Sequence, residues 1–127
     1  MDELSLVLVC EPENDLFKLL VDNGIACLRC ETPLAAVQRA LSGAGVLVLA
    51  DGYPERGWVI SDELLDVARQ KRLRVYIECP SALPGVKLGE PRDAKWERAV
   101  VSSNWFGEAV PSDRIQGIHS CRFVPTE

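Results

Sequence analysis

Strand-like and helix-like segments alternate from residue 4 to residue 79, and this alternation restricts the fold more than any other feature of the chain. Apolar runs with the length of buried strands occur at 4–10, 25–30, 46–51 and 74–79. Amphipathic segments with helical spacing separate them, at 13–24, 32–43 and 61–72. Strands and helices that alternate through short connections form a parallel sheet with helices on both faces. The sequence therefore predicts an α/β fold.

Capping residues support the expected helices. Thr32 and Ser61 stand where an N-cap is expected, and Pro33 occupies a first helical position that tolerates a missing N–H. Gly24 and Gly43 follow the first two helical segments, as helix-terminating glycines do. The arrangement that fits best is a flavodoxin-like three-layer α/β/α sandwich with a mainly parallel sheet in strand order 2-1-3-4.

The alternation weakens after residue 79. A loop rich in proline and glycine covers 81–96, and further strands are predicted at 97–103 and 115–124. We expect these one or two C-terminal strands to extend the sheet. Residues 1–127 are then a single domain, which we expect to be a fragment or module of a longer protein.

Charge and cysteine content restrict the partners and the compartment. The net charge is −5 with no run of Lys or Arg, so we expect no nucleic-acid partner. No apolar run approaches the roughly 20 residues that span a bilayer, so we expect no membrane partner. The five cysteines include Cys27 and Cys30 in CxxC spacing. Reduced structural thiols in a cytoplasmic protein are favoured, and a metal or redox pair is the alternative.

Polar residues at the carboxyl ends of the predicted strands indicate a site. Ligands of open parallel sheets bind beyond these ends, where the sequence places Glu11, Asp51 and Glu78 next to Cys79. Tyr53, in the loop after the third strand, is a further candidate ligand-binding residue. The alternative is that these residues only begin turns. The chain has no glycine-rich phosphate loop, and we expect no cofactor and no bound metal.

Two segments carry a resemblance to a known family, "VLVLADGYPERG" (46–57) and "LRVYIECPSALPG" (73–85). Through them the chain resembles the class I glutamine amidotransferase-like superfamily, which includes cysteine hydrolases and many non-enzymatic relatives. The resemblance covers roughly residues 4–85 and puts Cys79 at the position of the catalytic nucleophile. The later segments "AKWERAVVSSNWFG" and "GIHSCRFVP" look like the accessory half of such domains in carbohydrate-related proteins.

The nucleophile position departs from the enzyme pattern. Ile77 and Ser81 replace the flanking glycines, and Pro80 has no N–H to donate to an oxyanion. His119 is followed two residues later by Cys121, so the acidic partner of a catalytic histidine is absent. We therefore expect a non-catalytic domain for small-ligand binding or assembly, with other domains of a parent protein or further copies of itself as partners. The alternative is a cysteine-dependent hydrolase or amidotransferase-type enzyme that uses Cys79, assisted by Glu11 or His119.

Overall fold

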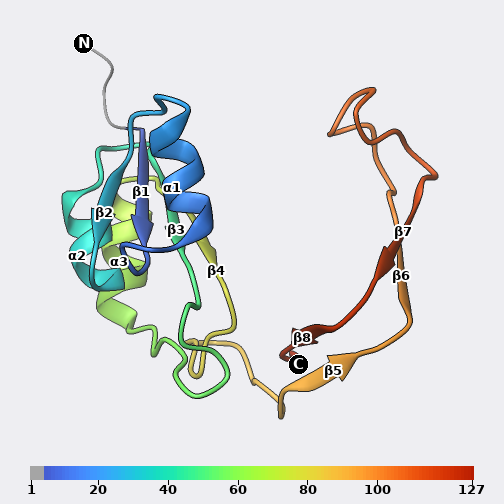
Figure 1. The fold of residues 1–127 in the computed structure, drawn as a ribbon. Helices are drawn as coiled ribbons and strands as arrows, with labels where there is room; N and C mark the ends of the chain where they lie inside the picture. Colours follow the sequence, from blue (N-terminus) through green and yellow to red (C-terminus); the bar gives the residue numbers. More distant parts are fainter. Residues whose placement is uncertain (1–4) are drawn as a thin grey trace. The chain divides into compact units, whose positions relative to one another are not determined.

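The computed structural model describes residues 5–127, and the chain divides after Leu88 into two compact units. The first unit has the alternation that the sequence predicts (Figure 1). Its elements are β1 (Leu6–Val9), α1 (Asp15–Asp22), β2 (Leu28–Cys30), α2 (Pro33–Arg39), β3 (Gly45–Val48), α3 (Asp62–Gln70) and β4 (Arg74–Ile77). The four strands are parallel in the order β2-β1-β3-β4, which confirms the predicted order 2-1-3-4. The predicted start of the first strand at Leu4 lies outside the described residues.

Side-chain caps begin the three helices, and two of these caps were predicted. Thr32 accepts a hydrogen bond from the N–H of Ala35, and Ser61 accepts one from the N–H of Leu64. Asn14 caps α1 in the same way. Gly24 lies just beyond α1 at φ +70°, a conformation that glycine adopts at little cost. The helices begin where a side-chain oxygen can satisfy an otherwise unpaired backbone N–H.

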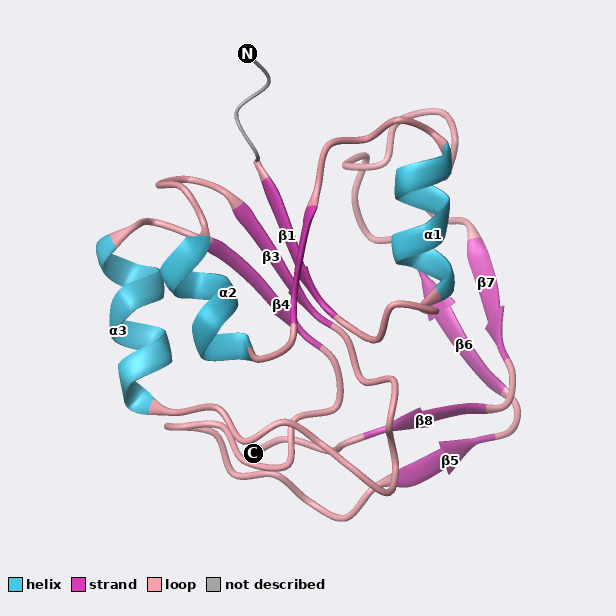
Figure 2. Cartoon of the chain, turned by 60° about the vertical axis from the view of Figure 1, so that its left-hand side comes forward, coloured by secondary structure: helices cyan, strands magenta, loops and turns pink. Residues whose placement is uncertain are grey.

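The two faces of the sheet contact different helices (Figure 2). Alternate residues of β1 and β3, among them Val7 and Val46, pack with the buried side chains of α2 and α3. Leu8, which points to the opposite face, packs with Phe17 and Leu20 of α1. The strict alternation of side chains along a strand separates the two clusters. No helix in the described part of the chain is long and apolar enough to cross a membrane.

The second unit is an antiparallel ribbon, drawn in orange to red in Figure 1. It consists of β5 (Arg92–Ala94), β6 (Glu97–Val100), β7 (Ile115–Ile118) and β8 (Cys121–Phe123). β5 pairs with β8, and β6 pairs with β7. The pairs Arg92–Phe123 and Glu97–Ile118 are in one register, so the two ladders continue each other. Between the ladders, the Trp96 and His119 rings meet edge to face with centroids 4.8 Å apart.

The expectation that the C-terminal strands extend the main sheet was wrong. The segment predicted as one strand at 115–124 is two strands, separated by Ser120 at φ +52°. These strands pair only within the ribbon, in sheets separate from the four-stranded one. A parallel strand needs a crossover of about a dozen residues, which is usually a helix. No helix is found from residue 71 onward, and the chain therefore turns back on itself in antiparallel pairs.

Candidate functional site

A pocket of about 800 Å³ lies at the carboxyl ends of the central strands. β1 and β3 are neighbours, but the chain continues from β1 toward β2 and from β3 toward β4, in opposite directions across the sheet. Loops that leave neighbouring strands in opposite directions open a crevice at this point, where open α/β sheets bind ligands. The pocket is lined by Cys10, Glu11, Pro12, Arg29, Glu31, Leu49, Ala50, Asp51, Gly52, Glu55, Arg56, Gly57, Trp58 and Ser81.

Asp51 joins the loops that follow β1 and β3. One carboxylate oxygen accepts the backbone N–H of Glu11 at 2.8 Å, and the other accepts the side-chain amide of Asn14. Because Asn14 also caps α1, a single carboxylate links the end of β3 to the start of that helix. Both donors are neutral, so neither cancels the negative charge of Asp51.

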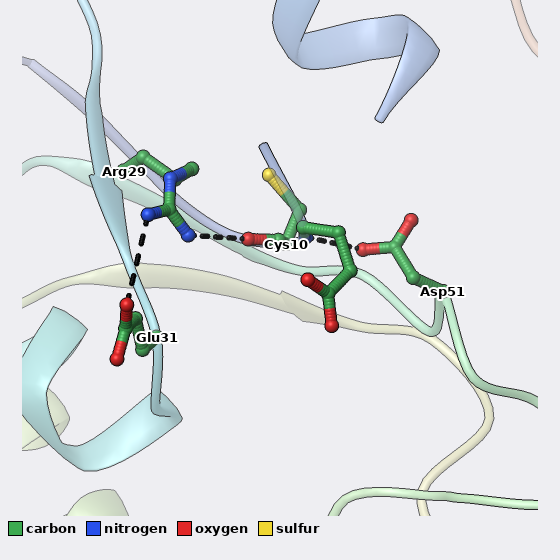
Figure 3. Close-up of polar contacts among 5 residues, drawn as sticks. Cys10, Arg29, Glu31 and Asp51 are labelled. Atoms are coloured by element: carbon green, nitrogen blue, oxygen red, sulfur yellow. Dashed lines mark hydrogen bonds and ion pairs between the residues drawn. The ribbon is translucent and has the colours of Figure 1, made fainter. Parts of the chain in front are cut away.

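Arg29 of β2 forms another side of the pocket (Figure 3). Its guanidinium donates a hydrogen bond to the carbonyl of Cys10 at 3.0 Å and lies 3.8 Å from a carboxylate oxygen of Glu31. In Figure 3 these contacts hold Arg29 between β2 and the end of β1, with Asp51 on the other side of Cys10. The positive charge of Arg29 is thus partly satisfied by the protein itself.

Trp58 provides the aromatic surface of the pocket. Its indole N–H donates to the carbonyl of Leu49 at 2.8 Å, and its ring packs against the core cluster on the α2 and α3 face. The backbone beside it also approaches closely: a Cβ at Gly57 would lie 3.2 Å from the carbonyl oxygen of Cys79. Trp58 is therefore a partly buried anchor of its loop.

The thiol of Cys10 is a neutral part of the lining. Burial, followed by the nearby charge of Asp51, raises the pKa of Cys10 to about 11. A thiol with this pKa carries almost no thiolate at neutral pH, and only the thiolate is a strong nucleophile. Cys10 therefore contributes an uncharged, weakly polar surface.

A second, smaller pocket of about 390 Å³ shares part of this lining and is strongly acidic. Glu11, Leu49 and Asp51 line both pockets. The remaining lining of the second consists of Glu13, Asn14, Asp15, Leu16 and Glu78. Three residues predicted from the strand ends, Glu11, Asp51 and Glu78, are therefore brought together at one edge of the sheet.

Cys79 follows β4 in an unusual conformation but lines neither pocket. Its φ is +39°, in the left-handed region that non-glycine residues seldom adopt. Burial, followed by the charge of Glu78, raises the pKa of this half-buried thiol. The carboxylate of Glu78 accepts a hydrogen bond from the backbone N–H of Ala50 at 2.9 Å. Pro80 follows directly, and no helix begins there.

Two other predicted site residues lie elsewhere. Tyr53 is half-buried and lines neither pocket. His119 belongs to the second unit, where it contacts Trp96.

The two cysteines of the CxxC segment lie on opposite faces of the sheet. Cys27 packs in the cluster beside α1, and Cys30 packs in the cluster beside α2 and α3. Residues three apart on an extended strand point to opposite faces, which explains this separation. Within residues 5–127, no group of three histidine, cysteine or acidic side chains is arranged to hold a metal ion.

Arg29 and Arg56 are among the lining residues that the sequence interpretation missed, together with the carboxylates Glu31 and Glu55. Arg29 gave a usable signal, because it is a charged residue near the carboxyl end of an otherwise apolar strand. In strand order 2-1-3-4, this end lies beside the end of β1 and therefore beside Glu11. Arg56 lies in an irregular loop, where no periodicity predicts the direction of a side chain.

Comparisons of the chain with protein-family models, with curated proteins and with solved structures found no match.

Proposed function

We propose that the first unit is a non-catalytic, glutamine amidotransferase-like domain that binds a small ligand, with a flavodoxin-like three-layer architecture, and that it serves a larger protein. One observation carries the proposal: a pocket of about 800 Å³ lies where the chain reverses its direction across the sheet. Its volume is within the range of about 300–1,000 Å³ that is typical of small-molecule sites. Segments that follow β1, β3 and β4 contribute to the lining, together with Arg29 from β2.

The surroundings of Cys79 support the non-catalytic part of the proposal. A nucleophilic thiol needs a lowered pKa and N–H donors for the developing oxyanion. The pKa of Cys79 is raised instead, and the next residue is Pro80, which has no N–H. Its positive φ is the one feature that it shares with strained nucleophile turns. The cysteine-hydrolase alternative depends on that feature, and it predicts rapid alkylation of Cys79.

A fragment screen monitored by NMR tests ligand binding directly. The ¹⁵N-labelled chain is mixed with a library of small polar molecules, and the amide signals of Gly52, Gly57 and Ser81 are followed with the indole signal of Trp58. We expect saturable shifts concentrated on these signals. Ala50→Phe, which places a large side chain in the lining, should abolish the shifts while the far-UV circular dichroism spectrum is retained. A library without any such binder would refute the proposal.

Assembly is a second candidate function, and the C-terminal unit favours it. Trp96 is 83% exposed and Trp105 is 86% exposed, both in the second unit, although monomeric proteins seldom expose large apolar surface. Residues 89–127 carry five basic and six acidic side chains, so two copies of this unit would not repel each other strongly. We propose that a second copy of the chain covers this surface.

Light scattering at increasing protein concentration tests assembly. We expect the mean mass to rise toward that of a dimer, and Trp96→Ser with Trp105→Ser to keep the chain monomeric. As a control, Leu19→Ser changes an exposed apolar residue of the first unit and should leave the association unchanged. A monomeric mass at every concentration would exclude self-association.

A further inference from the structure

We infer that the ligand carries a positively charged nitrogen and belongs to the class of small organic ammonium ions. This inference rests on the proposed ligand-binding function and specifies the chemistry of the same pocket. It depends on three features of the lining: its charge balance, the fixed tryptophan, and the acidic surface that continues beside it.

The charges that line the pocket do not balance. Four carboxylates, those of Glu11, Glu31, Asp51 and Glu55, stand against the guanidiniums of Arg29 and Arg56. Arg29 and Glu31 face each other, and this pair leaves three carboxylates and one guanidinium. Among residues 5–127, neither Glu11 nor Glu55 has an ion-pair partner, and Asp51 contacts only neutral donors. The remaining negative charge attracts a cation.

The remaining guanidinium is directed partly toward its own loop. The Nε atom of Arg56 lies 3.0 Å from the position that a Cβ on Gly52 would occupy. The Arg56 side chain therefore covers the glycine backbone of the same loop. A single arginine in this position does not make the pocket suitable for phosphate, because the three carboxylates that remain after the Arg29–Glu31 pair line the same pocket.

Trp58 gives the pocket a surface that suits an ammonium group. Its indole N–H donates to the carbonyl of Leu49, so the ring is held in place within the lining of the pocket. A cation over an indole ring is attracted to its negative face, and methylated ammonium ions are typically recognised by aromatic rings. Pro12 and Ala50 add apolar lining for the carbon atoms of such a ligand.

The neighbouring surface excludes anions further. The smaller pocket adds Glu13, Asp15 and Glu78 to the carboxylates that it shares with the larger one. The N-terminus of α1 would otherwise favour an anion, but Asn14 caps it and Asp15 lies in its first turn. A nucleotide or a sugar phosphate would place its phosphate among these carboxylates.

A matched pair of probes tests the inference. Choline and its uncharged isostere 3,3-dimethyl-1-butanol have nearly the same shape and differ in the charge of one atom. Each is titrated into the ¹⁵N-labelled full chain, with inorganic phosphate as the anionic probe. We expect choline to shift the Trp58 indole and Gly57 amide signals saturably and to bind about tenfold more tightly than the isostere, as a cation–π contact with nearby carboxylates allows.

Two carboxylate variants locate the effect. Glu11→Gln and Glu55→Gln, which change carboxylates without a side-chain hydrogen bond, should each weaken choline binding by several-fold, whereas binding of the isostere should stay the same. Glu63→Gln is the matched control, because Glu63 lies on α3, outside both pockets, and its charge change is the same. Loss of affinity in all three variants would indicate a non-specific charge effect and would overturn the inference.

The failures of the two proposals are distinguishable. If the isostere or phosphate binds at these signals as tightly as choline, the ammonium class is wrong, but the pocket remains a ligand site. The same conclusion follows if choline does not bind while members of the polar library do. If no probe and no library member shifts the pocket signals, the proposed function also fails.

Discussion

At the residue scale, Asp51 is the side chain that holds the pocket together. Its two hydrogen bonds join the loops after β1 and β3. A hydrogen bond to a charged group contributes about 1.5 kcal/mol or more, but exposure to water reduces this contribution. We therefore expect Asp51→Ala to lower the free energy of unfolding by about 1–2 kcal/mol. Urea denaturation measures the change. Glu55→Ala in the same loop removes a carboxylate without a hydrogen bond, and a loss equal to that of Asp51→Ala would contradict this role.

The reactivity of Cys79 gives a second prediction at this scale. Burial and then the charge of Glu78 raise the pKa of Cys79, so less of it is thiolate at neutral pH. We expect iodoacetamide to label Cys79 more slowly than the exposed Cys121. The labelling rate of Cys79 should rise only when the pH exceeds the pKa of an ordinary thiol. Peptide mapping by mass spectrometry separates the two sites.

The charge of Glu78 can be tested separately. Glu78→Gln keeps an oxygen for the N–H of Ala50 and removes the negative charge, so the pKa of Cys79 should fall and labelling should become faster. Labelling of Cys79 that is complete before Cys121 reacts would instead favour the cysteine-hydrolase alternative.

Sequence reasoning located part of this site because strand ends are readable in a parallel sheet. Glu11, Asp51 and Glu78 each end an apolar run, and the strand order then brings them to one edge. Arg56 and Tyr53 lie in an irregular loop, where the direction of a side chain depends on tertiary contacts. The sequence therefore predicted the edge of the sheet but not the complete lining.

At the scale of the elements, Lys71 connects α3 to the end of α2. Its ammonium group donates to the carbonyls of Val37, Gln38 and Ala40, which have no partner within the helix. We expect Lys71→Met to destabilise the protein by about 1–2 kcal/mol, from the lost carbonyl contacts and the lost cation at a helix C-terminus.

Arg69→Met is the matched control for Lys71→Met. It removes the same charge from the same helix, but Arg69 only pairs with Asp66 on an exposed surface. Such surface pairs contribute at most about 1 kcal/mol and often nothing measurable. Chemical denaturation of both variants gives the comparison, and equal losses would show that the carbonyl contacts of Lys71 do not stabilise α2.

The elements of the two halves were not equally predictable. Caps, glycines and hydrophobic periodicity are local signals, and they identified every helix and strand up to β4. Of the ribbon strands, β6, β7 and β8 lie within the segments predicted as strands at 97–103 and 115–124. Almost all of their residues are exposed, so no alternation of buried and exposed side chains indicates how they pair. β5 lies within the segment predicted as a loop. The antiparallel pairing of the four ribbon strands became clear only from their arrangement in space.

At the scale of the whole molecule, the buried core is concentrated in the first unit. Both hydrophobic clusters lie within it, and Leu64, only 2% exposed, is among the largest buried side chains. We expect Leu64→Ala to cost about 2–5 kcal/mol, because a cavity remains in a packed core. Leu19→Ala, at a position that is 60% exposed, should cost far less. Thermal unfolding monitored by circular dichroism would show both, and similar losses would mean that the core lies elsewhere.

The same distribution of buried side chains predicts how the two units behave when they are separated. Residues 1–88 contain both hydrophobic clusters and the four-stranded sheet, so we expect this fragment to unfold cooperatively in urea with native-like circular dichroism. Ala94 is the one buried hydrophobic residue of the ribbon, and an isolated two-stranded ribbon is at best marginally stable in water. We therefore expect a peptide of residues 89–127 to give narrow, unstructured amide signals by NMR. A non-cooperative 1–88 fragment would show that the α/β unit needs the ribbon, whereas a folded 89–127 peptide would show that the ribbon is stable without a large core.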